Sequence, residues 1–304
     1  MISDFYIKNI IRQLKKYKFH LIRDLHLIWY GLVVFKHKFP NKTINFLCNI
    51  CGKENEGTEI DVFDREKASC RHCGSNLRAR GIIDVLSNQL FGNSIALVDF
   101  PVDKSIKGLG VSDWIGYADL LSLKFSYINT YFHKDPKFDI LHIPSDEDNK
   151  YDFIIISEVL EHIDPPVDNG FINLHRLLKP NGVCVITVPF MNFETTWEHF
   201  PDLYTYKIIE IDGICSLVNT TRTGVEQTFS NLKFHGGGGA TLEKRIFTRE
   251  SLSANLSRAG FVDIDFYRHD KPQIGIKWIV NWSLPVSVRK KNITTANHHI
   301  ENNR

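Results

Sequence analysis

One stretch, residues 151–189, constrains the fold of this chain more than any other part of it. Residues 153–156 (FIII) have the pattern of a buried strand, and 171–178 have the apolar spacing of a helix. A Lys-Pro-Asn-Gly turn at 179–182 separates that helix from a second strand pattern at 183–188. Strand, helix and strand in this order are the unit of a parallel sheet. The stretch therefore predicts an α/β fold.

The same alternation of short apolar runs and helix-length segments begins near residue 95. Thr248 has the residue type and position of an N-cap for a helix that Gly260 closes. Two further strand patterns, 261–267 and 274–282, are expected to complete the sheet. Between these elements, residues 190–246 have weak periodicity and are rich in aromatic, His, Thr and Gly residues.

Four of the six cysteines form two C-x-x-C pairs, Cys48–Cys51 and Cys70–Cys73, separated by 18 residues. Each pair is followed by a glycine, which suits the tight turn of a zinc knuckle. Four thiolates can bind one Zn²⁺ tetrahedrally and leave no open coordination position. We therefore predict a structural zinc ribbon in a reducing compartment, with His72 as an exposed loop residue.

The amino-terminal segment, residues 1–45, is strongly basic, with nine Lys/Arg against two Asp, whereas the whole chain has a net charge of only +2. Its apolar residues recur at roughly helical spacing. We expect either a helical arm packed on its own protein or on a second subunit, or a surface that contacts an anionic membrane or RNA. The longest apolar run is nine residues, well short of the roughly 20 needed to span a bilayer, so a cytoplasmic location is expected.

Ser157, Glu158, Glu161 and His162 follow the first strand of the 151–189 stretch, where open α/β sheets bind ligands. Together with the Leu-Leu-Lys-Pro-Asn-Gly turn, this string resembles the class I S-adenosylmethionine-dependent methyltransferases, whose pattern is D-x-x-x-x-S-x-V-L-E-H followed by L-L-K-P-x-G. The resemblance implies a Rossmann-like sheet of seven strands, the last antiparallel, with helices on both faces. It also implies S-adenosylmethionine as the cofactor.

The resemblance assigns cofactor-binding roles to residues along the sheet. A glycine-bearing turn at 107–114, containing Gly108 and Gly110, corresponds to the family's first loop, and Asn129 stands where the family has a ribose-binding acid. Asp139 and Ile140 correspond to the adenine site. Ser157 and Glu158 complete the predicted set.

Acid–base roles are expected for His162, His199, His235 and Glu161, because a neutral imidazole can take the proton of an acceptor hydroxyl or amine. Glu158, Glu161 and His162 share the face of one helical turn if that segment is helical. A second divalent cation bound there is an alternative hypothesis.

The predicted domains are a basic helical arm (1–45), a zinc ribbon with its connecting helix (46–92), a methyltransferase domain (93–285) with an acceptor-side insert (190–246), and a polar tail (286–304). The favoured function is methyl transfer to an oxygen or nitrogen of a small molecule or sugar. Two alternatives remain: an RNA methyltransferase that grips nucleic acid through the ribbon and arm, and a non-catalytic binding module.

Overall fold

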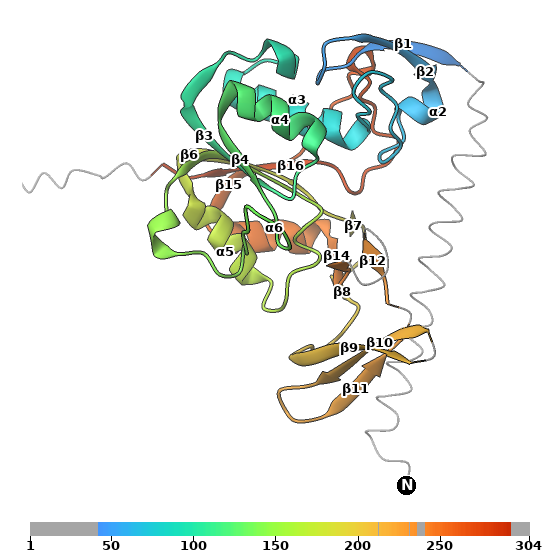
Figure 1. The fold of residues 1–304 in the computed structure, drawn as a ribbon, viewed down its shortest axis with the longest axis vertical. Coiled ribbons are helices and arrows are strands. Elements are labelled where there is room, and N and C mark those ends of the chain that lie inside the picture. Colours follow the sequence, from blue (N-terminus) through green and yellow to red (C-terminus); the bar gives the residue numbers. More distant parts are fainter. Residues whose placement is uncertain (1–41, 212, 231, 236–240, 293–304) are drawn as a thin grey trace, which may run out of the picture.

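A six-stranded sheet organises the chain in a computed structural model that describes residues 42–292 apart from 212, 231 and 236–240 (Figure 1). The strand order is β15-β16-β6-β5-β3-β4. The pairs β4–β3, β3–β5 and β5–β6 are parallel, whereas β16 is antiparallel to both of its neighbours. The strands are β3 (Asp103–Val111), β4 (Phe125–Thr130), β5 (Tyr151–Ser157), β6 (Leu178–Thr187), β15 (Phe261–Phe266) and β16 (Val286–Lys290).

Two helical layers cover the two faces of this sheet, because successive side chains of each central strand point to opposite sides. Phe153 and Ile155 pack on one side with α3 (Leu77–Phe91) and α4 (Ile115–Lys124). Ile154 and Ile156 pack on the other side with α5 (Asp168–Leu177) and α6 (Arg249–Arg258). The predicted Rossmann-like α/β fold is confirmed.

The number of strands differs from the expected seven, since the described residues place six in the sheet. After β4 the chain is rich in Lys, Asp and Pro, and it makes only an isolated bridge between Tyr131 and Lys137 and the short turn η2 (Ser145–Glu147). No seventh strand forms there among the described residues.

The last strand also lies later in the chain than expected. The strand predicted at 274–282 is wrong: its apolar Trp278 is buried against Gly81 of α3, and the chain there begins with the short turn η3 (Pro272–Ile274). The antiparallel strand is β16, which starts at Val286, within the predicted polar tail. Val286 and Val288 are buried in the sheet, while the basic residues that follow them make the segment look polar in sequence.

The four cysteines belong to a small unit that we call the cysteine module, residues 43–76. It contains the hairpin of β1 (Thr43–Leu47) and β2 (Glu54–Thr58), the short helix α2 (Glu59–Val62) and the two knuckles. Its apolar side chains join those of α3 and the sheet in one hydrophobic cluster. Nearly all of the basic arm, residues 1–41, lies outside the described residues.

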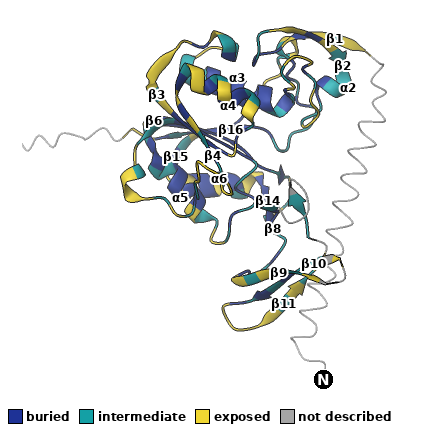
Figure 2. Ribbon diagram, viewed as in Figure 1, coloured by how far each residue is buried: buried dark blue, intermediate teal, exposed yellow. Residues whose placement is uncertain are grey.

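The insert forms small sheets beside the carboxyl ends of the parallel strands. A three-stranded antiparallel sheet extends away from the main sheet (Figure 1) and exposes much of its surface (Figure 2). Its strands are β9 (Thr205–Ile211), β10 (Ile214–Thr220) and β11 (Glu226–Phe229). The strand β14 (Arg245–Thr248) returns the chain to the core and pairs with β7 (Phe190–Met191) and β8 (Trp197–Glu198). The antiparallel pair of β12 (Phe234–His235) and β13 (Thr241–Leu242) lies between β11 and β14 in sequence.

No helix among the described residues has the length and apolarity to cross a bilayer.

Candidate functional site

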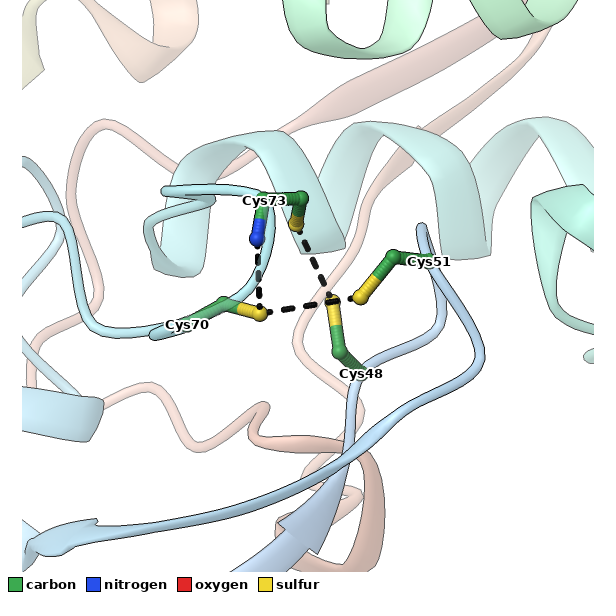
Figure 3. Close-up of side chains that lie close together, drawn as sticks. All are labelled: Cys48, Cys51, Cys70 and Cys73. Carbon is green, nitrogen blue, oxygen red and sulfur yellow. Dashed lines mark hydrogen bonds between the residues drawn. The ribbon is translucent and has the colours of Figure 1, made fainter.

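The four cysteine sulfurs converge on one point (Figure 3). The Sγ atoms of Cys48 and Cys73 are 3.7 Å apart, as are those of Cys51 and Cys70, and all four lie within 4.8 Å of one another. A tetrahedral site with zinc–sulfur bonds of about 2.3 Å has sulfur–sulfur edges of about 3.8 Å. The thiol set and its geometry therefore fit one Zn²⁺ without rearrangement.

Backbone conformation explains the glycine after each knuckle. Gly52 and Gly74 have φ of +67° and +74°, in the left-handed region that favours glycine. In the second knuckle the Cys73 backbone N–H also points at the Cys70 sulfur at 3.5 Å, a contact typical of thiolate ligands. His72 is exposed and contacts the carbonyl oxygen of Glu54, as the sequence predicted for a loop residue.

A fully buried arginine lies behind the cluster. Arg80 donates to neutral acceptors, which are the carbonyl oxygens of Val62, Ser75 and Gly275 and the hydroxyl of Ser69. Burial lowers the pKa of Arg80 to about 10, and the nearby cysteine thiolates oppose that shift. A zinc–tetrathiolate centre carries two net negative charges, so it would supply the counter-charge that this guanidinium lacks.

The expected glycine turn is displaced from its predicted place, because Gly108 and Gly110 lie inside β3. A Cβ at Gly108 would come within 2.2 Å of the Phe153 ring, and one at Gly110 within 2.0 Å of the Tyr127 hydroxyl. These glycines therefore make room for aromatic side chains beneath the strand. The turn itself follows at Ser112, whose φ is +61°.

Asn129 closes that turn from the end of β4. Its side-chain oxygen accepts the backbone N–H of Asp113 at 3.0 Å, and its amide donates to the Asp113 carbonyl at 2.9 Å. The structure thus places Asn129 at the carboxyl edge of the sheet, which we define as the ends of β3, β4 and β5.

Asp113 is a residue of this edge that the sequence reasoning missed. Its carboxyl group accepts the Tyr127 hydroxyl at 2.6 Å, and the buried Tyr117 hydroxyl also faces it. Burial raises the pKa of Asp113 to about 8. One sequence signal could have identified Asp113: it occupies the position of the glycine pattern at which a third glycine is expected.

The predicted adenine-site residues have different surroundings. Asp139 is half-buried, accepts the Leu141 backbone N–H and pairs with Nδ1 of His142 at 2.8 Å. Ile140 is only 3% exposed and belongs to the apolar core, and its carbonyl accepts from Asn173. The role of Ile140 on the adenine face stays a prediction, and in this structure its side chain is packed in the core beside α5.

Two charged contacts occupy the end of β5. The Ser157 hydroxyl accepts from Arg78 at 2.7 Å and shares a hydrogen bond with Thr187. Glu158 has φ of +57° and pairs with Arg65 at 2.6 Å. Burial raises the pKa of Glu158, but the charges of Arg65 and Arg78 outweigh it, so this pKa lies below its ordinary value.

The loop after Glu158 is clamped by the strand segment that leaves the insert. His162 donates from Nδ1 to the Leu242 carbonyl at 2.9 Å, and the Lys244 backbone N–H donates to the Glu161 carbonyl at 2.9 Å. The neutral His162 ring therefore carries its proton on Nδ1 and keeps a basic Nε2, 3.4 Å from Glu161 Oε1. Glu161 is fully buried, and burial raises its pKa well above the ordinary value, with Glu158 and Glu243 adding to the effect.

His199 lies in the insert, and both of its ring nitrogens have partners. Nε2 pairs with Glu243 at 2.8 Å, and Nδ1 accepts the Trp197 indole N–H at 3.3 Å. The indole can only donate, so the proton of a neutral His199 lies on Nε2. His235 is in β12, where its backbone pairs with Thr241, and its side chain lies outside the described part of the structure.

The hypothesis of a second cation is not supported by the geometry. Within the described ranges, the cysteines are the one group of potential ligands that converges on a point. Glu158 turns toward Arg65, while the ring of His162 is held by Leu242. The three side chains do not share a helical face, because residues 158–162 form a bend and a turn.

A profile of the methyltransferase domain matches residues 81–265. The chain belongs to the methyltransferase domain family. It is therefore an enzyme of the S-adenosylmethionine-dependent methyltransferase class. The match begins within α3 and ends in β15, so it spans both helical layers of the sheet.

Solved methyltransferase structures also resemble this chain. One is the 1,6-didemethyltoxoflavin-N1-methyltransferase of Burkholderia thailandensis, with 14% identity, 69% of this chain and 77% of that chain covered, and a TM-score of 0.39. Another is the sugar N-methyltransferase KedS8 of a Streptoalloteichus species, with 12% identity, 71% and 87% covered, and a TM-score of 0.41. No curated protein matches the chain.

Proposed function

We propose that this methyltransferase acts on an oxygen or nitrogen nucleophile of a small molecule or sugar, and that His162 accepts the proton of that nucleophile. The observation that carries the proposal is the hydrogen bond from His162 Nδ1 to the Leu242 carbonyl, which leaves Nε2 as the basic nitrogen. S-adenosylmethionine, when bound, supplies an electrophilic methyl group.

The carboxyl edge of the sheet fits this cofactor. The turn at Ser112–Trp114 is held by Asn129, and the Asp113 carboxyl group lies in the same turn, beside the hydroxyl of Tyr127. Asn129, Asp113 and Ser157 are the residues that we propose to hold it.

Around His162, the proton-accepting machinery is preorganised. The Leu242 carbonyl fixes the ring, and the Arg245 guanidinium donates to the Ile163 carbonyl at 2.7 Å and so fixes the loop. Glu161 Oε1 lies 3.4 Å from Nε2, so this buried carboxyl group contacts the ring from the side opposite Leu242. In this role His162 takes one proton from the acceptor O–H or N–H.

Aromatic and polar groups of the insert favour a small polar acceptor. Tyr206 donates to Asp164 at 3.0 Å, and Lys244 contacts the same carboxylate at 2.6 Å. Trp197 and His199 lie on the neighbouring strand segment. Rings combined with a few oriented polar groups are typical of small-molecule sites.

Charge argues against nucleic acid as the acceptor. Residues 43–76 carry four Lys/Arg and six Asp/Glu, so the cysteine module presents no basic excess. We also propose that the four cysteines hold one structural zinc.

The test is calorimetric binding of S-adenosylhomocysteine, followed by a screen of sugars, phenols and RNA that measures S-adenosylhomocysteine release. His162→Asn keeps an amide donor for Leu242 but removes the base, and we expect about 100-fold lower turnover with unchanged S-adenosylhomocysteine affinity. His269→Asn, which alters an exposed histidine in the loop after β15, is the control. Failure of the wild-type protein to bind S-adenosylhomocysteine, or full turnover by His162→Asn, contradicts the proposal.

A further inference from the structure

The loop between the two knuckles reaches the end of β5, although the two are far apart in sequence. Arg65, in this loop, contacts Glu158 Oε1 through Nη2 at 2.6 Å and donates from Nε to the Ser283 carbonyl at 3.0 Å. Its other terminal nitrogen contacts Glu66. The guanidinium is thus fixed on three sides, and its charge is directed at the first residue beyond the strand.

A second arginine approaches the same place from the first turn of α3. Arg78 donates from Nη1 to the Ser157 hydroxyl at 2.7 Å and from Nη2 to Glu66 Oε2 at 2.7 Å. Glu66 therefore bridges the two arginines, and each arginine contacts one of the two consecutive residues at the end of β5.

The knuckles hold this loop in place. The Arg78 backbone N–H donates to the Arg65 carbonyl at 3.2 Å, and Arg80 donates to the Ser69 hydroxyl at 3.1 Å beside Cys70. Arg80 also donates to the Ser75 carbonyl at 2.9 Å, two residues after Cys73. These hydrogen bonds, together with the backbone of α3 that joins Arg78 to Arg80, connect the two knuckle segments to the end of β5.

We propose that Arg65 and Arg78 are positioning residues of the methyl-transfer site, supplied by the cysteine module and the helix that it anchors, and that they hold Ser157 and Glu158 in the geometry that binds the cofactor. This inference rests on the proposed function, because it takes the end of β5 as part of the cofactor site. The cysteine module then contributes a residue to the border of the active site, in addition to stabilising the fold.

Glu158 needs a fixed cation beside it, because an unpaired carboxylate is energetically unfavourable at a buried position. Its backbone has a positive φ that L residues rarely adopt, and its carboxylate is mostly buried. The charged groups that face it are Arg65 and Arg78, with the acids Glu66 and Glu161 close to them. Without Arg65, an ionised Glu158 loses its direct partner beside two further acids, and the strand end is expected to rearrange.

The experiment measures S-adenosylhomocysteine affinity by calorimetry in the full chain. We expect at least tenfold weaker binding for Arg65→Gln and for Arg78→Gln. The matched control is Arg71→Gln, since Arg71 lies in the second knuckle and contacts the Glu56 carbonyl instead of the strand end. Zinc content and thermal unfolding of each variant establish that the module is intact.

A pH series separates positioning from a general loss of structure. In Arg65→Gln, Glu158 protonates at a higher pH than in the wild type, so affinity should recover toward the wild-type value as pH falls from 8.5 to 5.5 (about three pH units). The double variant Arg65→Gln/Glu158→Gln removes the buried charge and should bind more tightly than Arg65→Gln at pH 8, with no such pH dependence. His162 is retained in both variants, so its titration cancels in the comparison.

The outcomes are distinct. If the wild type does not bind S-adenosylhomocysteine, the proposed function fails. If the wild type binds it and both arginine variants bind equally well, or if the double variant is no better than Arg65→Gln at any pH, the positioning role is overturned while the proposed function stands.

Discussion

Tyr127 donates its hydroxyl proton to the buried carboxyl group of Asp113 across 2.6 Å. The bond joins β4 to the turn after β3, so the two outermost parallel strands hold the turn together. Because the donor comes from β4 and the acceptor from the turn after β3, the pair reports on the geometry of the carboxyl edge of the sheet.

Tyr127→Phe removes this donor and leaves the carboxyl group buried with less hydrogen bonding. We expect a loss of about 1–3 kcal/mol in the free energy of unfolding, measured by urea denaturation, and weaker S-adenosylhomocysteine binding. Tyr204→Phe alters a tyrosine that is 54% exposed and serves as the control. Equal stability of the two variants would contradict the importance of the bond.

Asp113 should make stability fall as pH rises. Its pKa is raised to about 8 in the folded protein by burial, against about 4 in an unfolded chain. Between these values the unfolded state has lost the proton and the folded state keeps it, so this group disfavours folding by up to about 1.4 kcal/mol per pH unit. Asp113→Asn removes this ionisable group and therefore its pH-dependent contribution. The stability of the variant relative to wild type should increase from pH 5 to pH 8 (roughly the span of the two pKa values). Parallel stability–pH curves for the two proteins would refute the assignment.

Gly110→Ala should destabilise the fold as well as weaken cofactor binding. The added Cβ would lie 2.0 Å from the Tyr127 hydroxyl and 2.7 Å from Asp113 Oδ2. We expect about 1–3 kcal/mol of lost stability by urea denaturation. In a Tyr127→Phe background the nearest clash is absent, so the same substitution should cost less; a fully additive double variant would argue against the packing explanation.

Purified protein should contain one zinc per chain, bound by Cys48, Cys51, Cys70 and Cys73. Cys48→Ser is expected to lose the metal and to lower the unfolding temperature, because Arg80 then lacks its counter-charge as well. Cys215→Ser, in β10 and away from the cluster, should keep both properties. Elemental analysis of reduced protein that finds no zinc would exclude the site.

The parts of the fold that could be predicted are those with local signals. The strand–helix–strand unit around Ser157 and the two knuckles follow patterns within a few dozen residues. The N-cap at Thr248 is confirmed by a reciprocal capping box with Ser251. In each case, neighbouring residues contain the physical reason for the structure.

The parts that could not be predicted depend on distant partners. Gly108 and Gly110 resemble a ligand-binding turn in sequence. In the structure, glycine is required at these positions because the side chains of Phe153 and Tyr127, on neighbouring strands, leave no space for a Cβ atom. The proton position on His162 depends on Leu242, 80 residues away. Likewise, β16 looks polar in sequence and the coil before it looks apolar, so only pairing with β6 and β15 shows which of the two is the strand.

The shared hydrophobic cluster of the cysteine module and the sheet means that the evolutionary unit and the folding unit of this protein have different borders. The family profile begins at Gly81, within the second turn of α3, yet Cys48, Ile50 and Phe63 are buried in the same core as Ile83 and Phe153. A fragment cut at the family border would expose one face of α3 to water and would aggregate more readily than it would fold. Thermal melting of the intact chain should accordingly be a single cooperative transition, with the metal released in the same step as the sheet unfolds.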